Sequence, residues 1–167
     1  MVQATESERP TFSAGTLTFD SAVTSNLQTT GQISMAGDFT IGIRCYPTSF
    51  NNVIIADNTT SNEFFKFTTT SQLRIKIDGS TQNITLDAGT FADNWLVVTR
   101  TSNVLRLYVN GAQQSTTPTL SGTTDIDAIG VRATDTNAYA GTIKEIQIFS
   151  SSSSRLVANV NDRLSTL

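Results

Sequence analysis

Hydrophobic and polar residues alternate in many short runs of this chain, and polar turns separate the runs. In the run 38–46, the apolar residues Phe39, Ile41, Ile43 and Cys45 fall at every second position. Because successive side chains of a strand point to opposite faces of a sheet, this period of two is typical of half-buried β-strands. Similar runs lie at 17–20, 52–57, 63–69, 73–78, 84–86, 126–132 and 140–149. The pattern predicts an all-β fold, a sandwich or jelly roll of two antiparallel sheets.

The alternation is most regular from Trp95 to Gln114, in the sequence WLVVTRTSNVLRLYVNGAQQ. Two apolar runs flank a polar tripeptide there and predict a hairpin within a sheet. The dipeptide Asn110-Gly111 favours a tight reversal at its end, because both residues tolerate the positive φ of such turns. We expect Trp95, the only Trp of the chain, to pack into the core; the alternative is a surface ring that stacks on a sugar.

The end of the chain follows a helical period instead. Apolar residues recur at helical spacing between 156 and 164, after the serine-rich stretch 150–154. A short helix is therefore predicted at about 155–164, with Ser153 or Ser154 as its N-cap. It is expected to dock on the sandwich.

The length of the chain suits a single domain with one core. We expect residues 1–12 to form an N-terminal arm and residues 13–167 to form one β-sandwich domain that includes the helix. The first ten residues lack the apolar core of a signal peptide, and no later segment is long enough to span a membrane.

Composition and charge exclude several classes of function. The net charge is −3, and Lys and Arg form no basic run, which argues against a nucleic-acid-binding surface. The chain contains no His, so Ser-His-Asp and Cys-His catalysis and the usual zinc sites are excluded. Its one cysteine, Cys45, can form no internal disulfide and is expected to be a buried structural thiol.

The motifs of the chain resemble a known family when they are taken in order. Residues 94–100 and 105–111, NWLVVTR and LRLYVNG, resemble the central hairpin of laminin-G-like, concanavalin A-like domains. Residues 140–149, AGTIKEIQIF, resemble their closing strand, and the segment 9–20 resembles the opening of such domains from phages and bacteria. The resemblance covers nearly the whole chain and implies a concanavalin A-like jelly-roll sandwich.

Glycan binding through the rim loops is one function that this resemblance implies. The expected contact residues are Tyr46, Phe50, Asn51 and Tyr139, which combine aromatic rings with a polar amide. Phe50 is the only aromatic residue in an otherwise polar loop, and an exposed apolar group there would favour binding. The alternative is that Phe50 folds back onto the core.

The resemblance also implies a Ca²⁺ site at the rim as an alternative to our expectation of no cofactor. Calcium prefers carboxylate, carbonyl and amide oxygens. Asp57, Asp135 and Asn137 lie in two loops that could supply them, although neither loop has the dense acidic pattern of dedicated calcium loops. These residues are otherwise solvated turn residues.

Glucanases of the same family carry acidic residues at alternate positions of one strand. Asp125 and Asp127 have this spacing, but Gly130 stands where a third acid would be expected. The two catalytic carboxyl groups of a retaining enzyme must lie about 5 Å apart. We expect no enzymatic activity, and we retain a glucanase-like hydrolase as the remote alternative.

We expect a non-catalytic phage protein on the virion surface, such as a capsid decoration, head-fibre or tail-associated subunit. This expectation rests on the phage-like opening segment and on release by lysis, which needs no export signal. The protein would be made in the host cytoplasm and would contact other virion proteins through Glu8, Arg9 and Pro10 of the arm. A surface polysaccharide is the second expected partner, whereas nucleic acid and membrane are not expected. The sequence leaves homo-oligomerisation open, and a stand-alone carbohydrate-binding module is the alternative function.

Overall fold

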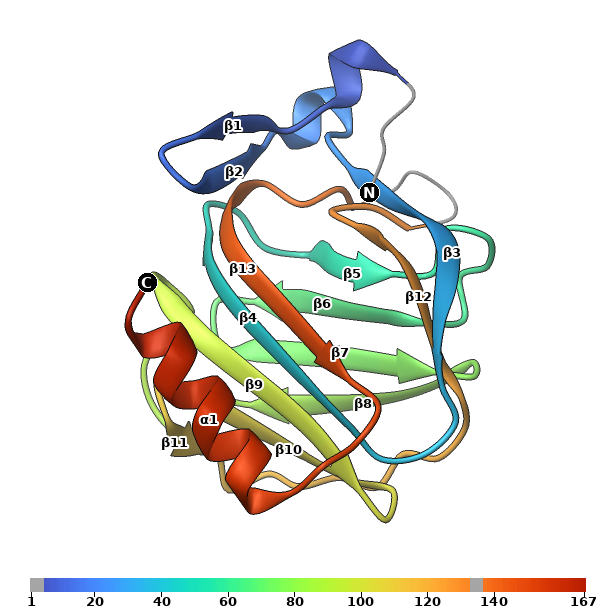
Figure 1. Cartoon of the computed structure of the whole chain (residues 1–167), viewed down its shortest axis with the longest axis vertical. Coiled ribbons are helices and arrows are strands. Elements are labelled where there is room, and N and C mark those ends of the chain that lie inside the picture. Colours follow the sequence, from blue (N-terminus) through green and yellow to red (C-terminus); the bar gives the residue numbers. More distant parts are fainter. Residues whose placement is uncertain (1–4, 133–136) are drawn as a thin grey trace.

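Two antiparallel sheets packed face to face form the body of the computed structural model, which describes residues 5–132 and 137–167 (Figure 1). The first sheet has seven strands in the order β1 (Thr11–Ser13), β2 (Thr16–Phe19), β13 (Gly141–Phe149), β4 (Phe39–Pro47), β9 (Asn94–Thr101), β10 (Val104–Val109) and β11 (Ala112–Gln113). The second has six in the order β3 (Leu27–Met35), β12 (Thr124–Ile129), β5 (Asn52–Ala56), β6 (Phe64–Thr69), β7 (Gln72–Ile77) and β8 (Ser80–Thr85). The architecture confirms the predicted all-β sandwich of two antiparallel sheets.

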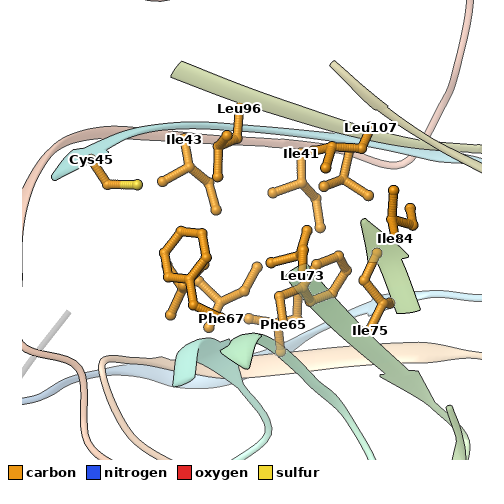
Figure 2. Packing of buried hydrophobic residues seen from close by; sticks show 14 of the residues in the cluster. Ile41, Ile43, Cys45, Phe65, Phe67, Leu73, Ile75, Ile84, Leu96 and Leu107 are labelled. Atoms are coloured by element: carbon orange, nitrogen blue, oxygen red, sulfur yellow. The ribbon is translucent and has the colours of Figure 1, made fainter. Parts of the chain in front are cut away.

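The core lies between the two sheets and consists of the inward residues of the alternating runs. Figure 2 shows the apolar side chains of one sheet facing those of the other across this layer. Phe39 of β4 and Phe65 of β6, for example, meet edge to face with ring centroids 6.1 Å apart. Cys45 is buried in the same layer, and desolvation raises the pKa of its thiol from 9.0 to about 12, as suits an inert structural thiol.

One helix, α1 (Ser154–Ser165), covers part of the outer face of the seven-stranded sheet (Figure 1). The Ser153 hydroxyl accepts a hydrogen bond from the Leu156 N–H, which confirms the predicted N-cap. Val160 and Leu164 are buried against β9, and Trp95 packs partly buried beside them, so Trp95 packs against the helix rather than in the layer between the sheets. A Cβ at position 42 would lie 2.4 Å from Val160, so Gly42 allows this close approach. Among the described residues, no helix is long and apolar enough to cross a membrane.

Three strands do not follow from the sequence pattern: β1, β3 and β11. β3 reads LQTTGQISM and is an edge strand in which every residue except Met35 is half-exposed or exposed, so it has no continuous apolar face. β1 begins within the segment predicted as an N-terminal arm, and it pairs with β2 in a hairpin that projects from one end of the sandwich (Figure 1). A 3-10 helix, η1 (Glu6–Glu8), precedes it, and the Glu8 carbonyl accepts a hydrogen bond from the Asn26 N–H. A second, η2 (Ser21–Val23), follows β2.

Candidate functional site

An exposed tyrosine lies in a groove on the outer face of the seven-stranded sheet, outside the part that α1 covers. Tyr46 is the penultimate residue of β4, and 46% of its surface is exposed. Because side chains alternate along a strand, Tyr46 shares its face with Arg44 and with Gly42, which lies under α1. The groove has a volume of about 390 Å³ and is lined by Thr16, Tyr46, Asp93, Thr142 and Lys144.

Four neighbouring strands bring these side chains together. The order β2, β13, β4, β9 places Thr142 directly opposite Tyr46 in the antiparallel register. A register shift after Ile143 makes Lys144 an extra residue in β13, and its side chain is exposed beside the groove. The groove therefore combines one phenol ring, one carboxylate, one ammonium group and the hydroxyl groups of two threonines.

The carboxylate of this groove is held in place by a buried arginine. Arg44 Nη2 lies 3.0 Å from Asp93 Oδ2, and the Arg44 side chain is almost buried whereas the Asp93 side chain is largely exposed. The Arg44 guanidinium also lies 5.5 Å from the centre of the Trp95 ring, in the geometry of a cation–π contact. The pair orients Asp93 toward solvent, where its oxygens can accept hydrogen bonds from hydroxyl groups of a ligand.

Of the four residues predicted for glycan contact, only Tyr46 lies in this groove. Tyr139 is 0% exposed and packs edge-on against Phe19 in the core, so the expectation of a surface contact is wrong for Tyr139. Phe50 is half-buried and packs against Phe67, with ring centroids 6.3 Å apart, as its alternative predicted. Asn51 is exposed, and its Nδ2 donates to Asn137 Oδ1 at 3.1 Å.

The residues predicted for calcium do not converge in the described structure. Asp57 is buried, and its carboxylate accepts hydrogen bonds from Thr59 and Thr60, which lower the pKa of this carboxyl although burial alone would raise it. The Asn137 carbonyl accepts a hydrogen bond from the Val53 N–H near the other end of β5, about 13 Å along the strand from Asp57. Asp135 lies outside the described residues. Within the described part of the chain, no three His, Cys, Asp or Glu side chains group as metal ligands would.

The two acids with glucanase-like spacing lie two residues apart on β12 and are both half-buried. The pairing of β12 with β3 shifts beside Asp127, because Ile126 pairs with Ile33 and Ala128 pairs with Gln28, so the extra residues of this irregularity lie in β3. The Asp127 carboxylate accepts a hydrogen bond from the Asn58 N–H at 2.6 Å, while desolvation raises its pKa. Asp127 thus holds the loop that follows β5. The alternation expected for Asp125 and Asp127 is kept, since both are half-buried and Ile126 between them is buried.

A second groove of about 400 Å³ lies at the rim of the sandwich, but no aromatic residue lines it. Its carboxylate, Asp87, accepts hydrogen bonds from the backbone and hydroxyl of Ser115. One of its four amides, Gln114, accepts a hydrogen bond from the Asp87 N–H. Since the carboxylate already accepts hydrogen bonds from the protein and no aromatic ring is present, the Tyr46 groove is the better candidate for a ligand.

The sequence did not indicate the Arg44–Asp93 pair or Lys144. Both depend on which strands become neighbours and on a bulge within β13. The sequence offered one signal for the groove: Arg44 lies two positions before Tyr46, so both side chains are expected on the same face of the strand.

Comparisons with known proteins agree with this architecture. A family model described as "Concanavalin A-like lectin/glucanases superfamily" (Laminin_G_3) matches residues 18–156. Domain 4 of AbnA, a GH43 extracellular arabinanase from Geobacillus stearothermophilus solved in complex with arabinotriose, is similar with a TM-score of 0.57 and 14% identity, over 78% of this chain and 68% of that chain. Domains LG4-5 of the mouse laminin α1 chain give a TM-score of 0.57 and 10% identity over 86% of this chain, which spans only 44% of that chain. No curated protein sequence matches this chain.

Proposed function

Because the chain belongs to the concanavalin A-like lectin/glucanases superfamily, we propose that it is a non-catalytic glycan-binding protein with its ligand in the Tyr46 groove. One observation carries this proposal: an exposed ring stands beside an oriented carboxylate on a surface that the docked helix leaves open. A tyrosine offers an apolar face to a sugar ring and a polar edge to its hydroxyl groups. The similarity to a domain solved with arabinotriose is consistent with this class of ligand.

Replacing the aromatic ring tests the proposal directly. A glycan array screen of the wild-type protein identifies the ligand, and calorimetry then measures its affinity for wild type and Tyr46→Ala. Loss of the ring should weaken binding about 10-fold or more, because aromatic anchors dominate small binding sites. The exposed position of Tyr46 predicts little change in stability, within about 0.5 kcal/mol.

Phe149→Ala is the matched control for this experiment. Phe149 is another exposed aromatic residue of the same sheet, at the far end of β13, and its loss should leave affinity unchanged. Equal affinity of Tyr46→Ala and wild type would place the ligand elsewhere. Release of reducing sugar from the bound glycan would contradict the non-catalytic part of the proposal.

A role as a phage virion surface subunit is the second function that we propose, and a feature of the N-terminal hairpin favours it. Phe12 of β1 is 70% exposed, on a hairpin that projects from the sandwich (Figure 1). Such a side chain suits burial against a partner subunit, and Glu8, Arg9 and Pro10 precede it in the chain. In this role the protein joins a capsid or tail protein at its N-terminal segment and turns the sandwich outward.

Particle incorporation tests the second function. In a phage that carries the gene, Phe12→Asp should reduce the amount of this protein in purified particles about 10-fold or more, because a charge then replaces the apolar contact. Phe149→Asp replaces another exposed aromatic ring, away from the hairpin, with the same charge and should leave incorporation unchanged. Wild-type incorporation of Phe12→Asp would refute the contact.

A further inference from the structure

A lysine on the outer face of the six-stranded sheet is almost entirely buried. Lys66 of β6 is only 8% exposed, and its ammonium group makes no hydrogen bond or ion pair with any residue that the structure describes. Its neighbours Phe65 and Phe67 point into the core, so alternation places Lys66 on the outer face. Unpaired cations are rarely buried, because the loss of hydration disfavours the charged form.

Three further cations surround this lysine. Arg74 of β7 lies directly opposite Lys66 in the antiparallel register. Lys76 Nζ and Arg132 Cζ lie 5.9 Å and 5.8 Å from the centre of the same ring, that of Phe64, which shares the outer face with Lys66. The four residues Lys66, Arg74, Lys76 and Arg132 are called the cationic patch below.

The cationic patch is unusual in a chain whose net charge is −3. Desolvation and the nearby charges of Arg132 and Arg74 lower the pKa of Lys66. Among the described residues, the ion pairs are Arg44–Asp93 and Arg163–Glu145, and neither involves Lys66, Arg74 or Lys76. Arg74 instead donates to Asn83 Oδ1, and Lys76 donates to the Ser61 carbonyl. Lys66, Arg74 and Lys76 are therefore held together without an ion pair to any carboxylate that the structure describes, an arrangement that a bound anion would stabilise.

We propose that the cationic patch is a second binding site, which takes a carboxylate or sulfate group of an acidic polysaccharide at Lys66. The anion contacts the Lys66 ammonium group, while Arg74 and Lys76 neutralise charge on neighbouring groups of the same chain. Lys66 lies opposite Arg74, and Lys76 lies two residues from Arg74 on the same face of β7, so a linear polyanion that runs along β7 can reach all three. The choice of a polysaccharide rests on the proposed glycan-binding function, whereas the anion site itself rests on the patch.

Calorimetric titration with oligogalacturonate, with dextran sulfate oligosaccharides and with neutral dextran of the same length tests this inference. Oligogalacturonate or the sulfated chain should bind wild type and raise its Tm by about 3–6 °C at a concentration tenfold above Kd. Lys66→Met should weaken this binding about 10-fold or more, because it removes a charge-assisted contact. Arg74→Gln should also weaken binding of the acidic oligosaccharide, and this variant leaves the buried position 66 unchanged.

Arg155→Gln is the matched control, because it removes one exposed cation on α1, at the opposite side of the sandwich. Equal affinity of wild type, Lys66→Met and Arg155→Gln would overturn the site. Lys66-dependent binding of inorganic sulfate alone, with neither oligosaccharide bound, would overturn the polysaccharide as ligand.

The glycan found for the Tyr46 groove is titrated into the same variants to separate the two proposals. If Lys66→Met still binds that glycan but no longer binds the acidic oligosaccharide, the two ligands occupy two distinct sites. If wild type binds no glycan at Tyr46 but binds the acidic oligosaccharide through Lys66, the proposed groove fails and the cationic patch stands.

Discussion

Two almost fully buried cations, Arg100 of β9 and Lys66 of β6, differ in how the protein compensates for the lost hydration of their charge. Arg100 is 1% exposed, and its guanidinium donates hydrogen bonds to the carbonyls of Met35, Gly37 and Gly122. It also lies 5.0 Å from the centre of the Phe39 ring. Lys66 is 8% exposed and has no such partners among the described residues.

The difference separates a structural charge from one that is available to a ligand. The guanidinium of Arg100 replaces lost hydration with backbone carbonyls from two connections, and it holds these segments against the end of β9. Lys66 has no such replacement among the described residues, keeps only part of its hydration and stands among like charges. A partner from outside the chain can therefore gain more at Lys66 than at Arg100, whose donors are already used.

The largest effect is expected at Arg100. Arg100→Met keeps much of the side-chain volume but removes the donors, and leaves the carbonyls of Met35, Gly37 and Gly122 without this partner. Loss of such a buried network should lower the free energy of unfolding by about 3–5 kcal/mol. Urea denaturation followed by tryptophan fluorescence measures the change.

Arg106→Met is the control for that experiment, since Arg106 of β10 is only half-buried and should tolerate the change within about 0.5 kcal/mol. If Arg100→Met were as stable as wild type, water would replace Arg100 as the hydrogen-bond donor to the three carbonyls. Arg100 would then not be needed to stabilise these segments.

The sequence predicts the environment of these cations only in part. Alternation correctly places Arg100 on the same face of its strand as Leu96 and Val98, because a period of two is a local property of the backbone. Its acceptors could not be predicted, since Gly37 and Gly122 are 63 and 22 residues away in sequence. Such contacts depend on the path of whole connections rather than on any single run.

The candidate sites show the same limit. Tyr46 was predicted as a contact residue, but its partner Asp93 reaches Arg44 only because β9 pairs with β4. Tyr139 was misassigned because a ring near a loop can turn inward, and the sequence around it does not show which way. The cationic patch was missed because Lys66 and Arg74 each look like the solvated face of an ordinary strand until β6 and β7 are paired.

A smaller effect of opposite sign is expected at Lys66. Lys66→Met removes a largely buried charge that has no partner among the described residues, so in the absence of a bound anion it should raise the free energy of unfolding by about 1–2 kcal/mol near neutral pH. The pKa of Lys66 is lowered from 10.5 in the folded protein. Between the lowered pKa and 10.5, the unfolded chain keeps a proton that the folded protein has released, so the stability of wild type rises relative to the variant.

The amount by which the free energy of unfolding of Lys66→Met exceeds that of wild type should therefore be largest below the lowered pKa of Lys66. It should vanish as the pH approaches 10.5. Burial raises the pKa values of Cys45 and Tyr139, so in this alkaline range they lose protons mainly in the unfolded chain; they are present in both proteins, and their contributions cancel in the difference. Urea denaturation of both proteins from pH 7 to 10.5 measures it. If the difference in free energy of unfolding did not change with pH, Lys66 would destabilise the folded protein through its packing rather than through its charge. The contrast with Arg100 would then concern side-chain packing and not the treatment of a buried charge.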